Sequence, residues 1–217
     1  MLSAVVPTLN AAAHLHDCLS TLAGADEIIV SDGGSEDETI AVAERNGVTI
    51  LTGAAGRGAQ LARGAAAARG DWLLFVHADT RLAPDWAAAV AGHQAQHPRK
   101  AATFRFRLDD PAWQAGLIER GVELRARLLG LPYGDQGLLV PRELYERSGG
   151  FRPLALMEDV DLVRRIGPIH TLEADAVTSA DRWRRDGWLA RSARNLACLS
   201  LWSLGMSEAR IARLYRG

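Results

Sequence analysis

The chain has 217 residues, a length that fits one compact domain and is too short for two full ones. Its hydrophobic (48%) and charged (24%) fractions are those of an ordinary globular protein with a sizeable core. The formal net charge of −1 excludes a strong overall attraction to nucleic acid or to anionic lipid, so we expect no nucleic-acid partner.

The first hundred residues alternate short β-type runs with helical patterns. The runs predicted as strands are 2–6, 27–31, 48–52 and 72–77. The patterns predicted as helices are 11–22, a segment from a Ser35/Glu38 capping box to Gly47, 59–68, and a segment after Pro84. This alternation predicts a parallel, doubly wound α/β sheet whose loops line one crevice.

The rhythm changes after Lys100, the only lysine of the chain. Residues 103–108 alternate Phe and Arg, which predicts an antiparallel or edge strand. A helix is expected over 113–129, a strand over 137–140, a helix over 143–147, and two C-terminal helices that break at Gly205. We expect one domain over 1–217, with a nucleotide-binding half (1–100), an acceptor-facing half (101–187) and a helical tail (188–217).

The character of the N-terminal segment and the spacing of the cysteines favour a cytoplasmic protein. The N-terminus lacks the basic flank of a signal peptide, and Cys18 and Cys198 belong to no metal-spaced cluster, so both are expected to be buried. In the tail, leucines at helical spacing stand beside arginines. That pattern fits a packed tail, or else a surface for a homodimer or for peripheral contact at the inner membrane.

Several acidic residues and one arginine stand where such a sheet binds ligands. Asp32 ends the second strand, where it either accepts from a base or ribose or favours a helix dipole. Asp79 follows the fourth strand and either holds a divalent cation or caps a helix. Arg57 follows the third strand, as a phosphate ligand or as a solvated loop residue.

A second acidic group, Glu158, Asp159 and Asp161, precedes a helical run. Mutual repulsion would raise the carboxylate pKa and suit general-base chemistry, whereas the alternative is simple complementation of the helix dipole. The G-x-G-x-x-G and G-K-[ST] patterns of dinucleotide and P-loop sites are missing from the expected places in the sequence.

Taken together, these segments resemble the inverting family-2 glycosyltransferases over residues 2 to about 183. The motifs that carry the resemblance are Val-Pro-Thr-Leu-Asn (6–10), Val-Ser-Asp-Gly-Gly-Ser (30–35), Gly-Asp (70–71) with Phe-Val-His-Ala-Asp-Thr (75–80), and Met-Glu-Asp (157–159). The segments 56–60, 131–137 and 182–185 are also similar to a bacterial radical-SAM/selenodomain-associated subgroup.

The resemblance implies a GT-A fold with a mostly parallel central sheet flanked by helices. It further implies a nucleoside-diphosphate-sugar donor, Mg²⁺ or Mn²⁺, inversion at the anomeric carbon, and a hydroxyl or lipid-phosphate acceptor. The residues it assigns to the donor are Pro7, Thr8, Asp32, Arg57, Asp71 and Asp79. The remaining assignments are Asp159 as catalytic base with Glu158 beside it, and Asp135, Gln136, Arg182 and Trp183 on the acceptor side.

The sequence departs from the family at the metal motif, Asp-x-Asp. Its first position is His77, so the implied metal site consists of His77 and Asp79. Arg182-Trp183 is similar to a motif of processive members, but Ser179 replaces its glutamine, so processive synthesis is not expected. Two alternatives stay open: a nucleotidyltransferase, although the loop 8–12 has no glycine or basic residue, and a non-catalytic nucleotide-sugar binder.

Overall fold

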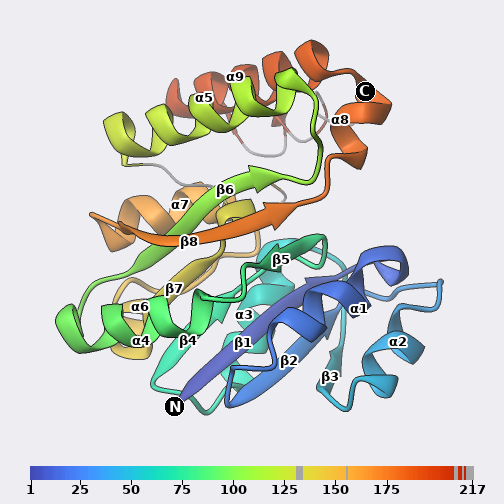
Figure 1. Ribbon diagram of the computed structural model, residues 1–217, viewed down its shortest axis with the longest axis vertical. Coiled ribbons are helices and arrows are strands. Elements are labelled where there is room, and N and C mark those ends of the chain that lie inside the picture. The colour runs from blue at the N-terminus through green and yellow to red at the C-terminus, as the bar shows by residue number, and fades with distance from the viewer. Residues whose placement is uncertain (131–133, 155, 208–209, 212, 214–217) are drawn as a thin grey trace.

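A computed structural model describes residues 1–130, 134–154, 156–207, 210–211 and 213. Its strands form one eight-stranded sheet in the order β3-β2-β1-β4-β7-β6-β8-β5 (Figure 1). The strands are β1 (Leu2–Thr8), β2 (Glu27–Asp32), β3 (Thr49–Thr52), β4 (Trp72–Phe75), β5 (Thr80–Leu82), β6 (Ala102–Leu108), β7 (Leu138–Pro141) and β8 (His170–Thr178). The α-helices are α1 (Ala12–Thr21), α2 (Thr39–Arg45), α3 (Arg57–Ala67), α4 (Trp86–Gln96), α5 (Trp113–Leu129), α6 (Arg142–Arg147), α7 (Glu158–Ile166), α8 (Asp181–Asp186) and α9 (Trp188–Ser203).

The N-terminal strands pair in parallel, as the sequence predicts. In β1, Thr8 is in register with Asp32 of β2, and Val5 is in register with Phe75 of β4. All seven residues of β1 are buried, because helices cover both faces of the sheet. The carboxyl ends of β1, β2 and β4 therefore meet at one edge, where the following loops form a common site.

The second half of the sheet differs from the prediction in two ways. Strand β6 is antiparallel to β7, which is one of the two predicted options, but it is also parallel to β8 and lies inside the sheet rather than at its edge. Strands β5 and β8 were not predicted. In β8, the acidic residues Glu173 and Asp175 hide the strand signal, and Asp175 is compensated by Arg105 of β6 at 2.8 Å.

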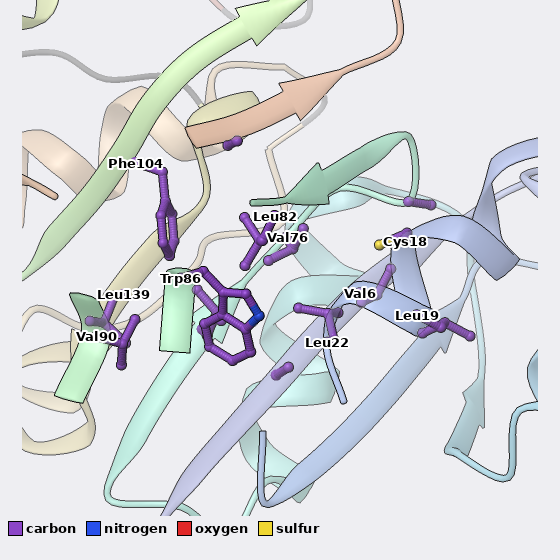
Figure 2. Close-up of a cluster of buried hydrophobic side chains, with 14 of the residues drawn as sticks. Val6, Cys18, Leu19, Leu22, Val76, Leu82, Trp86, Val90, Phe104 and Leu139 are labelled. Carbon is purple, nitrogen blue, oxygen red and sulfur yellow. The ribbon is translucent and has the colours of Figure 1, made fainter. Parts of the chain in front are cut away.

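Two apolar clusters hold helices against opposite faces of the sheet. Figure 2 shows the first, in which Trp86 of α4 and Leu22 pack with Val6 of β1 and Phe104 of β6. The second joins Val5 and other residues of the opposite face to α3, α6 and α7. The two cysteines are free and buried, as expected. Helices on both faces fix the strands whose ends carry the site.

The capping box expected at Ser35 does not form. Helix α2 begins at Thr39 with no side-chain cap, and the Ser35 hydroxyl instead donates to Asp32. The Ser35 hydroxyl bonds to Asp32 at the end of β2 instead of capping α2, because a buried carboxylate requires hydrogen-bond donors. In the tail, α9 ends at Ser203 before Gly205, and much of the second expected helix lies outside the described residues. None of the described helices is both long enough and apolar enough to cross a membrane.

Candidate active site

A large cleft of about 840 Å³ opens at the carboxyl ends of the parallel strands. Loops after β1 and β4, the start of α3 and the start of α8 surround it. Six residues that the sequence assigns to the site line this cleft: Pro7, Thr8, Arg57, His77, Asp79 and Arg182. The structure thus brings residues from four separate segments of the chain to one place.

Asp32 lies behind the cleft wall rather than among the lining residues. Its carboxylate is 1% exposed and accepts hydrogen bonds from the Thr8 hydroxyl (2.8 Å), the Ser35 hydroxyl (2.5 Å) and the main-chain N–H groups of Gly34 and Ser35. Burial acts to raise the pKa of Asp32, but these donors outweigh it and hold the pKa below its usual value. The structure shows Asp32 fixing Thr8 and the following turn, and its contact with a nucleobase stays a prediction.

The Gly-Arg-Gly segment at the start of α3 positions Arg57. Gly56 has φ +137°, which favours glycine, and a Cβ on Gly58 would lie 2.1 Å from the Arg152 carbonyl oxygen. This close approach brings the start of α3 against the start of α7, where the Arg57 guanidinium pairs with Glu158. Glu158 is only 1% exposed, so Arg57 is the partner of a buried carboxylate.

A smaller central pocket of about 150 Å³ continues inward from the cleft. The two spaces share Arg57, His77, Asp79 and Arg182, and the central pocket adds Asp135, Asp159 and Trp183. The cleft and the central pocket therefore form one continuous site.

Asp159 is held in the central pocket by main-chain donors. Its carboxylate accepts from Gly134 N–H at 2.7 Å and from Val160 N–H at 2.8 Å. Gly134 has no side chain to block the pocket, since a Cβ there would lie 2.7 Å from His77 Nε2. Burial and the nearby Arg57 lower the pKa of His77 to about 4, so its ring is neutral at neutral pH.

The three acids at the start of α7 have separate partners, which the sequence did not predict. Glu158 pairs with Arg57, Asp159 accepts main-chain N–H groups, and Asp161 pairs with Arg165 at 2.5 Å. The pKa of Glu158 is raised, with burial as the first cause and Asp159 as a lesser one. Mutual repulsion is therefore secondary to desolvation at this helix end.

Asp79, Asp135 and Arg182 surround the inner part of the site. Arg182 Nη2 lies 3.6 Å from Asp79 Oδ2, so a cation faces this carboxylate. Burial raises the pKa of Asp135 to about 6, Arg125 opposes the rise, and Asp159 and Asp79 add to it. The carboxylates at this end of the site thus lie close enough to influence one another.

Trp183 forms an inner wall. Its side chain is buried, its ring centre lies 6.3 Å from that of Phe106, and the Arg191 guanidinium stands 5.0 Å from the ring. It borders the central pocket, on the side away from the cleft.

Two predicted site residues lie elsewhere. Asp71 precedes β4, at the opposite edge of the sheet, and its side chain is 85% exposed and pairs with the amino terminus. Parallel strands present only their carboxyl ends to the cleft, which places the start of β4 away from it. Gln136 is buried, and its amide donates to the Phe104 carbonyl at 3.3 Å, so it supports β6 rather than lining the site.

We expect Asp71→Ala to leave nucleotide affinity unchanged and to alter the free energy of unfolding by no more than about 0.5 kcal/mol, since an exposed ion pair contributes little. Calorimetric titration with a nucleoside diphosphate and a thermal melt measure both quantities. A tenfold loss of affinity for the nucleoside diphosphate would show that Asp71 belongs to the binding site.

Other contributors were missed by sequence reasoning. Gln60 donates to the Thr8 carbonyl at 2.6 Å and to the Ser31 carbonyl at 3.1 Å, which fixes α3 against two strand ends. Its place in the 56–60 segment was the available signal. Thr178 and Asn195 line the central pocket from β8 and α9, and no local pattern marks them.

A mostly parallel sheet with its cleft at the strand ends and antiparallel strands beyond it places the chain in the class of GT-A folds. Residues 3–141 match the family described as Glycosyl transferase family 2, and the chain belongs to that family. Relatives named PGL/p-HBAD biosynthesis glycosyltransferase, from Mycobacterium bovis and Mycobacterium tuberculosis, are 38% identical over 112 residues. The match covers 45% of this chain and 43% of each relative, so the chain spans less than half of their length.

Solved structures agree on the fold. The mannosyltransferase PcManGT from Pyrobaculum calidifontis, in complex with GDP-Man and Mn²⁺, matches with a TM-score of 0.71 at 20% identity over 99% of this chain and 68% of that one. S. aureus TarS 1–349 matches with a TM-score of 0.64 at 17% identity, over 97% and 68%. Glucosyl-3-phosphoglycerate synthase from Mycobacterium tuberculosis, with Mn²⁺ and UDP, gives 0.57 at 22% identity, over 82% and 70%.

Proposed function

We propose that the chain transfers a glycosyl group from a nucleoside-diphosphate sugar to an acceptor, with inversion at the anomeric carbon. The observation that carries the proposal is the continuous path from the large cleft, past Arg57 and His77, to Asp159 in the central pocket. The family membership of residues 3–141 supports it. So do the nucleotide sugars bound in the structural neighbours, which are GDP-Man in PcManGT and UDP-GlcNAc in S. aureus TarS.

The cleft suits the donor. Pro7 and Thr8 would border the base, while Arg57 and Arg182 supply positive charge for the diphosphate. Arg57 is also the first residue of α3, whose N-terminal N–H groups favour an anion. These groups bind charge that grows on the diphosphate as the sugar leaves, which lowers the barrier to transfer.

The residues also fit a divalent cation held by Asp79 with His77 beside it. Both line the cleft, and Mg²⁺ sites in proteins commonly use one or two side chains together with phosphate oxygens and water. Within the described part of the chain, no group of three His, Cys, Asp or Glu residues could hold an ion alone. The cation would therefore bind together with the diphosphate, whose charge it would neutralise.

Asp159 is proposed as the base. As the acceptor oxygen forms a bond to C1 of the sugar, the bond from C1 to the diphosphate oxygen breaks and its electron pair leaves with the diphosphate. The acceptor proton passes to the Asp159 carboxylate, which two main-chain N–H groups hold in place. Attack from the side opposite the leaving group inverts the anomeric carbon.

Neither alternative function gains an observation from the structure. The loop after β1 brings no basic residue to the position where a nucleotidyltransferase would bind triphosphate. A purely binding role would leave Asp159 without a task. The proposal also includes membership of the radical-SAM/selenodomain-associated subgroup and a cytoplasmic location. Its acceptor is either a hydroxyl compound or a lipid phosphate.

A panel of nucleoside-diphosphate sugars, each with and without Mn²⁺, tests the donor proposal in a thermal melt. A ligand at 100 times its Kd stabilises the folded state by about 2.7 kcal/mol, which corresponds to roughly 5–11 °C in Tm for a chain of this size. We expect at least one nucleotide sugar to give such a shift, and a larger one with Mn²⁺. If every member of the panel leaves Tm unchanged, the donor site is wrongly assigned.

A further inference from the structure

An apolar groove of about 540 Å³ runs between α5 and α9, which lie side by side beyond β6 and β8 (Figure 1). Large apolar side chains that stay exposed in the structure line it from both helices. They are Trp113, Leu117 and Leu124 on α5 and Leu189 and Leu196 on α9. Exposed apolar surface gathered in one groove marks a binding site more than scattered leucines do.

The groove adjoins the proposed reaction site. Asp135, Trp183 and Asn195 line both the groove and the central pocket. The lining therefore changes from apolar at the outer end to polar at the inner end, where Asp159 stands. A molecule that fills both spaces must have an apolar body and a polar end.

The charges nearby do not by themselves decide between an anionic bilayer and a smaller ligand. Arg184 pairs with Asp110 at 2.6 Å, whereas Arg185, Arg191 and Arg194 share the carboxylate of Asp186. A bilayer surface or a second copy of the chain would cover the leucines, but neither would account for the lining that the groove shares with the central pocket.

We infer that the groove between α5 and α9 binds the hydrocarbon chain of a lipid acceptor whose terminal hydroxyl enters the central pocket. The inference rests on the proposed glycosyl transfer and names its acceptor class. The hydroxyl at the inner end would reach Asp159, which takes its proton as the oxygen attacks the sugar. The donor enters from the opposite side, through the large cleft.

Two glycines of α5 provide a matched test. A side chain on Gly121 would enter the groove, and a Cβ there meets nothing within 4 Å. Gly116, on the same helix, is equally free of contacts and lies outside the groove lining. Gly121→Phe should therefore fill the groove without strain, and Gly116→Phe is its control.

The probes are 1-octanol, 1-decanol and 1-dodecanol, and the readout is the fluorescence of the tryptophans that line the groove. For the native chain and Gly116→Phe we expect affinity to rise about fourfold per added methylene. Gly121→Phe should weaken the binding of 1-dodecanol at least tenfold while all three proteins bind a nucleoside diphosphate equally.

Each other outcome has a definite meaning. Affinity independent of chain length, or equal in Gly121→Phe and native protein, overturns the inference even if nucleotide still binds. If the native chain does not bind a nucleoside diphosphate, the proposed function is overturned instead. If light scattering shows a native dimer that Gly121→Phe dissociates, and no alkanol binds, the groove is a subunit interface. Equal binding of both proteins to phosphatidylglycerol vesicles, again without alkanol binding, assigns it to a membrane surface.

Discussion

Asp159→Asn is expected to lower the rate of glycosyl transfer by roughly two to four orders of magnitude, the usual contribution of a general base. Asparagine keeps the shape of the side chain, and its oxygen can still accept from Gly134 N–H, but it cannot take the acceptor proton. Donor affinity should stay within about twofold of the native value, because Asp159 does not line the donor cleft. Turnover with a hydroxyl acceptor and calorimetric titration with the donor measure the two effects.

Asp161→Asn is the control on the same helix. Asp161 pairs with Arg165 and Arg152, away from the central pocket, so its loss should affect stability more than turnover. Near-normal turnover by Asp159→Asn on a hydroxyl acceptor would show that another group takes the proton. An acceptor that is already ionised, such as a lipid phosphate, needs no base and must not be used in this comparison.

The parallel half of the sheet could be predicted from sequence because its signals are local. Strands buried on both faces read as continuous apolar runs, and Gly47 marks a helix end directly. In the second half of the sheet, strand formation depends on pairing between residues that are far apart in the sequence. The acids of β8 look unsuited to a strand until Arg105 and Arg107 of the neighbouring β6 are seen to face Asp175.

The same distinction separates the site residues. Thr8 ends β1 and Asp79 lies in the loop that follows β4, so their meeting at one edge follows from the topology of the parallel strands. Asp71 and Gln136 were assigned from motif resemblance without strand direction or burial, and the structure places both away from the cleft. Asn195 joins the site only because α9 folds back over it, a contact that no short pattern encodes.

The pairing of Arg57 with Glu158 gives this site both a structural and a chemical role. Burial raises the pKa of Glu158, and Arg57 is the first group that opposes the rise. The Arg57 side chain is 36% exposed and lines the cleft, whereas the Glu158 side chain is almost fully enclosed. One face of Arg57 therefore neutralises a buried charge while the other remains available to a diphosphate.

Arg57→Met should separate these two roles. The variant leaves the Glu158 carboxylate buried without its cation, which we expect to cost about 2 kcal/mol, below the usual range for buried pairs because solvent reaches the guanidinium. That loss corresponds to a decrease in Tm of roughly 4–8 °C. Nucleotide affinity should fall by about one to two orders of magnitude, since a charge-assisted hydrogen bond contributes roughly 1.5–3 kcal/mol.

The stability loss should depend on pH in a definite direction. Glu158 has a raised pKa in the folded chain. Between the usual glutamate pKa and this raised pKa, the folded state therefore binds more protons than the unfolded state. The free energy of unfolding falls as pH rises through that interval. Removing Arg57 widens that interval. The deficit in Tm of Arg57→Met should therefore be larger at pH 8 than at pH 5.

The double variant Arg57→Met with Glu158→Gln completes the test. It contains no buried charge at this position, so Tm should recover by at least half of the loss seen in Arg57→Met. Nucleotide affinity should stay as low as in Arg57→Met, because the cation that faces the cleft is still missing. Recovery of affinity together with Tm would mean that Arg57 acts only by holding the starts of α3 and α7 together, and that the diphosphate is bound by other groups.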